Sequence, residues 1–141
     1  MTPLPCVLLV DDDPTTNFLN TSLLKRLGAA ERILVARDGQ EALTYLQEHC
    51  VPLTPACPVL ILLDVNMPGM NGVRFLEAYQ HLPIARQPEI VVIMLSTSIH
   101  PRDIARVREI NIVADFVSKP LTAAKITELL QTYFSPPAPQ T

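Results

Sequence analysis

The chain has 141 residues, 48% of them hydrophobic, and a formal net charge of −3. This length predicts one domain with a sizeable core, and the charge argues against the clustered basic surface that nucleic-acid binding needs. No apolar run approaches the ~18–20 residues of a membrane-spanning helix, and the first residues, MTPLPCVLLVDDD, lack the basic start of a secretory signal. We therefore expect a cytoplasmic protein that contacts neither nucleic acid nor membrane.

The cysteines Cys6, Cys50 and Cys57 are compatible with that compartment. An odd number of cysteines without CxxC spacing argues against a disulfide framework or a zinc site. Cys50 and Cys57 flank a proline-rich segment and could be neighbours, but we expect reduced, partly buried thiols. The histidines are scattered, with no two at the spacing of metal ligands, so no metal role is expected for them.

The first half of the chain alternates between apolar runs and amphipathic segments. Strands are predicted at Cys6–Val10 and Arg32–Ala36, because both runs are apolar and end in turn-forming residues. Asp13 and Asp38 each precede a helical pattern as N-caps, and the first helix is predicted to run from Pro14 to Leu27. The residues expected to be buried in these two helices are Leu19, Leu23, Leu24 and Leu27, then Ala42, Leu43, Leu46 and Cys50.

The second half continues this alternation. Val51–Pro58 holds three prolines and is expected to be an irregular connection. Ser135–Thr141 also holds three prolines and is predicted to be a flexible tail after a single domain of residues 1–134. Strands are predicted over Val59–Asp64, Glu89–Leu95 and Ala114–Ser118. The helices after them are expected to turn inward Val73, Leu76 and Tyr79, then Ile104 and Val107, then Ile126, Leu129, Leu130 and Tyr133.

Repeated β-α units predict an α/β fold, with a doubly wound parallel sheet covered by helices on both faces. Apolar runs such as Val59–Leu63 are typical of strands buried on both faces. In an open parallel sheet the carboxyl ends of the strands share one edge, and ligands bind there. Residues that end the strands are therefore the first candidates for a functional site.

Four of the predicted strands end in residues suited to phosphate or metal chemistry. Asp11 and Asp12 follow the first strand, Asp64 ends the third, Ser96 follows the fourth and Lys119 follows the fifth. Crowded carboxylates are costly to bury unless they are paired or hold a cation, and an all-oxygen acidic site suits Mg²⁺. A carboxylate can also attack phosphorus, while a metal and an ammonium group absorb the charge. Each residue singly has a structural interpretation as a turn, cap or surface residue, but their convergence favours function.

Four segments combine into a more specific pattern: LLVDDDP at Leu8–Pro14, LLDVNMPGMNG at Leu62–Gly72, MLSTS at Met94–Ser98 and FVSKPL at Phe116–Leu121. With them the chain resembles the receiver domains of two-component response regulators. The resemblance implies a flavodoxin-like (βα)5 sheet in the order 2-1-3-4-5. It also implies a regulator that accepts a phosphoryl group from a sensor histidine kinase or a histidine phosphotransfer protein. Because the tail is too short for a DNA-binding or enzymatic segment, we expect a stand-alone, single-domain member. The downstream protein target is not specified by the sequence.

The resemblance implies a role for each residue of the acidic site. Asp64 is the implied phospho-acceptor. Asp12 is the implied direct Mg²⁺ ligand, Asp11 acts mostly through water, and Asn66 lends its backbone carbonyl while its side chain faces the attacking water. Lys119 is expected to pair with Asp64 and then with a phosphoryl oxygen, and the bond to the proline after it is expected to be cis.

Ser96 and Phe116 stand at the positions of the family's switch residues. In the family the phosphoryl group draws the hydroxyl inward and the aromatic ring follows, which reshapes the face made by the fourth helix, fifth strand and fifth helix. By analogy, a homodimer would form through the same face. Phe116 lacks the hydroxyl of the commoner Tyr, so the switch is expected to depend on packing. Ser98 stands where some members carry a larger residue near the phosphoryl group.

Two other functions are alternatives to a receiver. A Mg²⁺-dependent phosphatase with an aspartyl nucleophile would typically need a second acid two residues later, where this chain has Asn66. A flavin-binding electron carrier would need a hydroxyl- and Gly-rich loop after the first strand, where aspartates repel phosphate. We therefore expect a signalling switch that catalyses only its own phosphorylation and dephosphorylation, and not a turnover enzyme.

Overall fold

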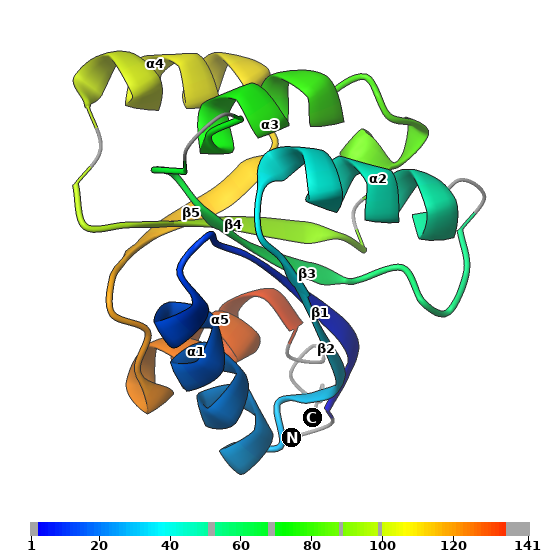
Figure 1. Cartoon of the computed structure of the whole chain (residues 1–141), viewed down its shortest axis with the longest axis vertical. Helices are drawn as coiled ribbons and strands as arrows, with labels where there is room; N and C mark the ends of the chain where they lie inside the picture. Colours follow the sequence, from blue (N-terminus) through cyan, green and yellow to red (C-terminus); the bar gives the residue numbers. More distant parts are fainter. Residues whose placement is uncertain (1–2, 51–52, 68–69, 88, 99, 135–141) are drawn as a thin grey trace, which may run out of the picture.

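The computed structural model describes residues 3–50, 53–67, 70–87, 89–98 and 100–134. Its centre is a five-stranded parallel sheet in the order β2-β1-β3-β4-β5 (Figure 1). The strands are β1 Leu4–Val10, β2 Ala30–Ala36, β3 Leu60–Asp64, β4 Val91–Ser96 and β5 Val113–Ser118. The helices are α1 Pro14–Arg26, α2 Gly39–Cys50, α3 Gly72–Tyr79, the 3-10 turn η1 Pro83–Arg86, α4 Pro101–Ile110 and α5 Ala123–Phe134. This order confirms the predicted doubly wound fold.

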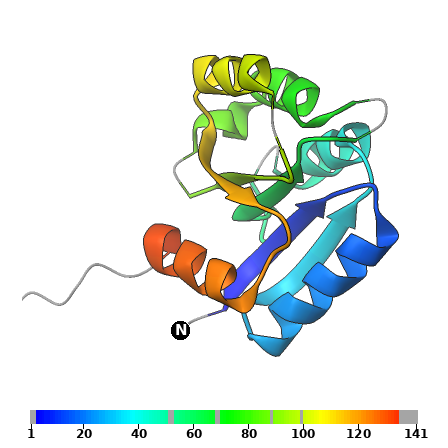
Figure 2. The same ribbon diagram turned by 90° about the vertical axis from the view of Figure 1, so that its left-hand side faces the viewer.

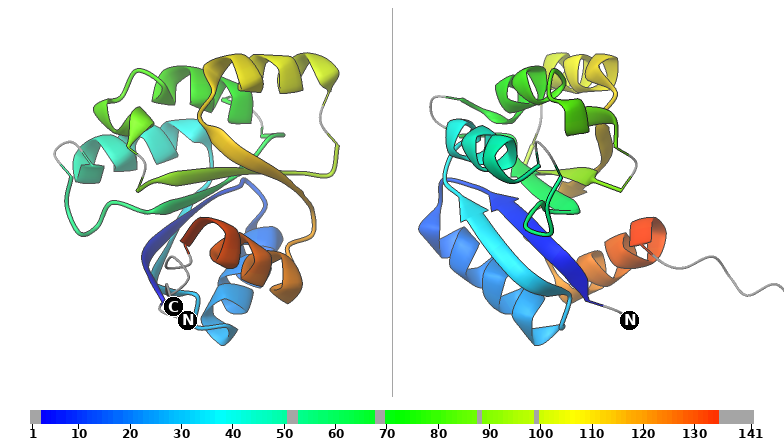
Figure 3. Two further views of the ribbon diagram at one scale, coloured as in Figure 1. Left: turned by 180° about the vertical axis from the view of Figure 1, so that it is seen from behind. Right: turned by 90° about the vertical axis from the view of Figure 1, so that its right-hand side faces the viewer.

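Helices cover both faces of the sheet. α2, α3 and α4 lie on one face and α1 and α5 on the other (Figures 1 and 2), and the two further views in Figure 3 show the same layers. Successive strand side chains point to opposite faces, so Ile61 and Leu63 of β3 pack in one core cluster and Leu60 and Leu62 in the other. All of β3 is buried. This central strand is therefore held from both sides, and Asp64 lies at its carboxyl end.

The predicted caps are present where the helices begin. The Asp13 carboxylate accepts hydrogen bonds from the backbone N–H groups of Thr15 and Thr16, and the Asp38 carboxylate accepts one of 2.8 Å from Glu41 N–H. Strands β1 and β2 begin earlier than predicted, because their first residues already pair across the sheet, as Leu4 does with Ala30. The boundaries at the sheet edge that carries the polar residues agree closely with the prediction.

The inner face of α1 differs from the prediction. Leu19 was expected to be buried but is 59% exposed, and its neighbour Phe18 is 70% exposed. The buried residues of the helix are Asn17, Asn20 and Leu24. Five residues turn a helix by about 140° beyond one full turn, so Leu19 faces away when Leu24 faces the sheet. The end of the helix nearest the acidic site therefore presents two amides to the interior and apolar side chains to solvent.

The expectation of reduced thiols at Cys50 and Cys57 is wrong. The two residues form a disulfide, with a Cα–Cα distance of 5.0 Å, and both are buried. The chain turns back after α2, and the Tyr45 hydroxyl, one turn before Cys50, donates a 2.9 Å hydrogen bond to Ala56 O in this turn. The spacing of seven residues does not reveal this pairing, because the fold of the turn creates it. Cys6 is a free, buried cysteine, as expected, and burial raises the pKa of its thiol.

Two predictions fall on residues that the structure does not describe. The proposed tail, Ser135–Thr141, and residues 51–52 of the proline-rich connection lie outside the described residues. Among the helices that the structure describes, none combines the length and the apolar character needed to cross a membrane.

Candidate functional site

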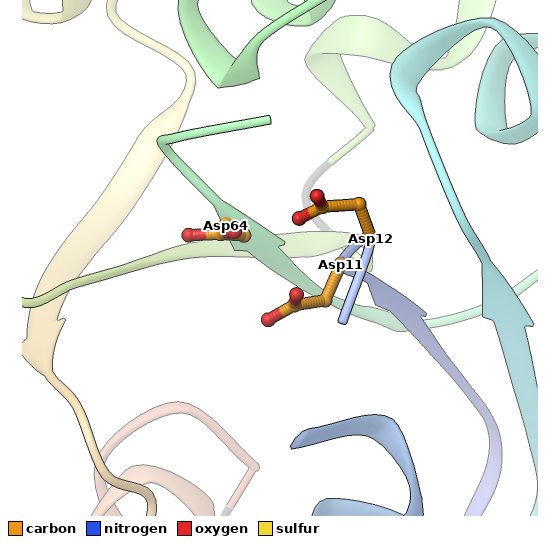
Figure 4. A group of neighbouring side chains, drawn as sticks. All are labelled: Asp11, Asp12 and Asp64. Carbon is orange, nitrogen blue, oxygen red and sulfur yellow. The ribbon is translucent and has the colours of Figure 1, made fainter. Parts of the chain in front are cut away.

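The acidic site lies at the carboxyl ends of β1 and β3. The two strands are neighbours in the sheet, with Val10 of β1 in register with Leu63 of β3, so the residues that follow them lie side by side. Figure 4 shows the side chains of Asp11, Asp12 and Asp64 at this edge. One carboxylate oxygen from each lies within 4.8 Å of the others. Parallel pairing thus brings together acids that are far apart in the sequence.

Lys119 joins this group from the carboxyl end of β5, the last strand of the sheet. Its ammonium nitrogen lies 2.9 Å from Asp11 Oδ2 and 3.0 Å from Asp64 Oδ1. The backbone positions it, because Ser118 pairs with Ser96 and the Lys119 N–H donates a 2.9 Å hydrogen bond to Ser96 O. The peptide bond from Lys119 to Pro120 is cis, as predicted. One cation therefore bridges two buried carboxylates, which are only 4% and 5% exposed.

The charges in this cluster do not cancel. Burial raises the pKa of Asp64, as does the Asp11 carboxylate, and the hydrogen bond from Lys119 offsets only part of this. Burial alone would lower the pKa of Lys119, but its hydrogen bonds to Asp11 and Asp64 outweigh burial and raise it. With Asp12 nearby, three carboxylates face one ammonium group. The arrangement favours the arrival of a further cation.

The donor set is suited to Mg²⁺. All candidate ligand atoms are carboxylate oxygens, and Mg²⁺ is bound by one or two carboxylates together with waters and phosphate oxygens. The Asp12 side chain is exposed and makes neither an ion pair nor a hydrogen bond within the described part of the chain, so its oxygens are free to act as ligands. The Asn66 N–H lies 3.3 Å from Asp64 Oδ1, and its side chain is exposed beside the cluster.

Ser96 and Phe116 lie on the strands next to this edge. Ser96 ends β4 and is 8% exposed, and its hydroxyl oxygen is buried with no hydrogen-bond partner among the described residues. Phe116 of β5 is in register with Met94 of β4 and is half-buried against the core on the α2–α4 face. A buried hydroxyl without a partner is uncommon. It is therefore a candidate to bind a group that enters the site.

Two residues of the site had no assigned role in the sequence analysis. A Cβ atom at Gly72 would lie 2.7 Å from the backbone oxygen of Asp64, so only glycine lets the chain pass this close to the acid. Asn17 donates a 2.8 Å hydrogen bond from its side-chain nitrogen to Asp11 O. Gly72 belongs to a segment that the resemblance included, whereas Asn17 gave no signal, because an isolated amide in a helical pattern usually faces solvent.

The sequence profile of the response regulator receiver domain matches residues 7–131. The chain belongs to this family. Receiver domains are the phospho-accepting signalling domains of two-component systems, so the predicted family and the general function are confirmed.

Individual relatives agree with the family assignment. Response regulator Rcp1 of Synechocystis sp. is 29% identical over 110 residues, which cover 78% of this chain and 74% of Rcp1. The crystal structure of a two-component response regulator from Cytophaga hutchinsonii is 33% identical and superimposes with a TM-score of 0.80, over 93% of this chain and 97% of that one. The phosphorylated cyanobacterial phytochrome response regulator RcpA is 26% identical, with a TM-score of 0.74 over 92% and 94% of the two chains.

The bridge formed by Lys119 predicts a pH-dependent stability. Without Mg²⁺ at neutral pH, Lys119→Met should lower the free energy of unfolding of the receiver by about 3 kcal/mol, because it leaves buried carboxylates unpaired. The variant also loses the hydrogen bond that lowers the pKa of Asp64. An acid with a folded-state pKa above its unfolded value binds more protons when folded, so the variant should recover stability as pH falls toward that pKa. Urea unfolding followed by circular dichroism at several pH values measures this.

Lys125→Met is the matched control. Lys125 is half-buried nearby, but its ammonium group donates to Ser118 O and Pro120 O and not to a carboxylate. An equal pH dependence in the two variants, or an unchanged stability of Lys119→Met, would contradict the proposed electrostatic role.

Proposed function

We propose that Asp64 of this receiver takes a phosphoryl group from a phosphohistidine of a sensor histidine kinase or a histidine phosphotransfer protein. The observation that carries this proposal is the Lys119 ammonium group, held 2.9 Å and 3.0 Å from Asp11 and Asp64 at the end of the buried strand β3. A carboxylate on a rigid strand, with a cation already beside it, is arranged for attack on phosphorus. The signal then passes to a protein target, or the phosphoryl group passes to another histidine.

The proposed transfer is a simple displacement. An oxygen of Asp64 forms a bond to phosphorus, the bond from phosphorus to the donor imidazole breaks, and an acyl phosphate results. Mg²⁺, when bound, neutralises charge on the transferred oxygens. We propose that Asp12 binds it directly, Asp11 mostly through water, and that Asp64 and the Asn66 carbonyl complete the protein ligands. Lys119 then exchanges Asp64 for a phosphoryl oxygen, which keeps its charge compensated.

The same residues support a switch in preference to a turnover enzyme. Asn66, two residues after the nucleophile, is exposed and carries an amide, which cannot protonate a leaving group. Water can still attack the acyl phosphate of Asp64 and return the free carboxylate. We therefore propose that the receiver catalyses its own phosphorylation and dephosphorylation only.

Asp64→Asn tests the acceptor. Incubation with a small acyl phosphate and Mg²⁺ should add one phosphoryl group to the wild type, and chelation of Mg²⁺ should prevent it. The amide that replaces the carboxylate in the variant is not a comparable nucleophile, so the variant should show no labelling by intact-protein mass spectrometry.

Asp115→Asn, which alters an exposed acid on β5, is the control and should be labelled like the wild type. Full labelling of Asp64→Asn would place the acceptor on another residue and remove the central claim.

We further propose that Ser96 and Phe116 transmit the change to the face made by α4, β5 and α5. The Ser96 hydroxyl is buried and has no partner among the described residues, which supports a hydrogen bond from it to a phosphoryl oxygen once that oxygen is present. Phe116 is half-buried, so space that Ser96 vacates can receive its ring. On the same face, the Tyr133 hydroxyl lies 3.2 Å from both Ala114 O and Asp115 Oδ2. A target protein, or a second copy in a homodimer, would bind to this face.

Ser96→Ala tests the switch with beryllofluoride as a non-hydrolysable mimic of the phosphoryl group. In the wild type, NMR signals near Asp64, the Phe116 ring and α4 should all shift. In Ser96→Ala the signals near Asp64 should shift while the Phe116 ring stays unchanged. The exposed Ser98→Ala should respond like the wild type. A normal response of Phe116 in Ser96→Ala would exclude Ser96 from the switch.

We propose that the phosphohistidine donor docks on α1. Leu19 lines a groove of about 480 Å³ whose wall also includes Lys119, Pro120 and Leu121. Phe18 and Leu19 are exposed, 70% and 59% respectively, although most apolar residues of the domain are buried. An exposed apolar patch beside a polar reaction centre is typical of a protein contact. This patch would hold the donor protein while its phosphohistidine reaches Asp64.

Leu19→Glu tests this docking surface. Phosphotransfer from a cognate kinase or phosphotransfer protein should slow by about tenfold, the effect of about 1.4 kcal/mol of lost contact, while labelling by a small acyl phosphate stays unchanged. Leu53→Glu is the matched control, because Leu53 is similarly exposed, at 54%, but follows α2 at the opposite edge of the sheet. Equal effects of both variants on the protein donor would contradict docking on α1.

A further inference from the structure

The turn between β1 and α1 carries two of the acids and is held through Asp11. The Asp11 N–H donates to Ala36 O of β2 at 3.0 Å. Its carboxylate accepts a 2.9 Å hydrogen bond from Asp13 N–H, and its carbonyl oxygen accepts a 2.8 Å hydrogen bond from the side-chain nitrogen of Asn17. The last of these bonds is buried and joins the turn to the body of α1. Asn17 therefore connects a rigid helix to the backbone just before Asp12.

The planarity of the peptide bond makes this contact important for Asp12. The carbonyl oxygen of Asp11 lies in the same plane as the nitrogen and Cα atom of Asp12. A donor that holds this oxygen fixes the rotation of the plane, and with it the direction in which the Asp12 side chain leaves the backbone. The Asp12 carboxylate is exposed and has no hydrogen bond or ion pair of its own within the described residues. Its placement thus depends on the backbone that Asn17 holds.

Packing alone does not explain an asparagine at this position. Asn17 is 7% exposed, and its side-chain oxygen is buried with no partner among the described residues. Such an oxygen is destabilising, and asparagine is a poorer helix former than leucine. Leu24, two turns further along α1, shows that this face of the helix also buries an apolar side chain. Among the described residues, the hydrogen bond to Asp11 O is the contact that asparagine makes here and leucine could not.

We infer that Asn17 is a positioning residue for the metal site, because its amide holds the Asp11–Asp12 peptide in the orientation that aims Asp12 at the cation. This inference rests on the proposed function, since it takes the divalent ion to be Mg²⁺ bound by Asp12. Groups that orient metal ligands typically change metal affinity by 10–100-fold when they are removed. Loss of the Asn17 amide should therefore lower the affinity for Mg²⁺ even when no phosphoryl donor is present.

The test is calorimetric titration of the unphosphorylated 141-residue chain with Mg²⁺. Asn17→Leu should weaken Mg²⁺ binding by about tenfold, while its melting temperature without Mg²⁺ should stay close to that of the wild type, because the variant removes the unsatisfied Asn17 oxygen but leaves Asp11 O without its donor. With a small acyl phosphate, the Mg²⁺ concentration that gives half the maximal rate should rise by a similar factor, and the maximal rate should be retained. Asn17→Ala should show the same loss of affinity and serves if the leucine does not fit.

Asn20→Leu is the matched control, because Asn20 is the next buried amide on this face of α1. It should bind Mg²⁺ like the wild type. The inference is overturned if the Asn17 variants bind Mg²⁺ within twofold of the wild type, if Asn20→Leu loses as much affinity, or if the wild type binds no Mg²⁺. The labelling of Asp64→Asn decides the proposed function separately: persistent labelling would overturn the acceptor without affecting a Mg²⁺ defect in the Asn17 variants.

Discussion

The Lys119 ammonium group between Asp11 and Asp64 is the interaction on which the rest of this receiver depends. Two carboxylates that are 4% and 5% exposed are costly to keep ionised at the end of apolar strands. The ammonium group compensates part of their charge from 2.9 Å and 3.0 Å. It does not compensate all of it, because Asp12 adds a third carboxylate. The cluster thus combines partial compensation by Lys119 with an excess of negative charge that favours a further cation.

The surroundings of this cluster are arranged to limit its movement. Strand β3 is buried along its whole length, so Asp64 is fixed by the core on both faces of the sheet. Gly72 lets the next helix begin against the Asp64 backbone, where a side chain would collide. Hydrogen bonds from Asp13 N–H and the Asn17 amide hold the turn that carries Asp11. Rigid placement matters because a transfer to a carboxylate depends on the alignment of the reacting atoms.

The site also borders two surfaces with different chemistry. Toward α1 it meets a groove with the exposed apolar side chain of Leu19, which suits contact with a phosphohistidine donor. Toward α4 and α5 it meets Ser96 and Phe116, which suit the transmission of a local change to a target. Lys119 lines the groove and also forms an ion pair with Asp64. In the proposed function, donor contact and signal output use separate faces that share one reaction centre.

The sequence by itself determined the α/β class, the helix caps at Asp13 and Asp38, and the edge at which the acids gather. These features follow from local patterns, since buried parallel strands are continuous apolar runs and their carboxyl ends share one edge. Only the tertiary structure decided which face of α1 is buried, because Asn17 and Asn20 interrupt its apolar pattern and leave Leu19 outside. The tertiary structure likewise decided the Cys50–Cys57 disulfide, because this pairing depends on how the chain turns after α2. It also decided the hydrogen bond from Asn17 to Asp11 O, which depends on where α1 meets the turn before it. Contacts of this kind leave no periodic trace in a sequence, because they are set by the meeting of elements in space and not by the order of residues within one element.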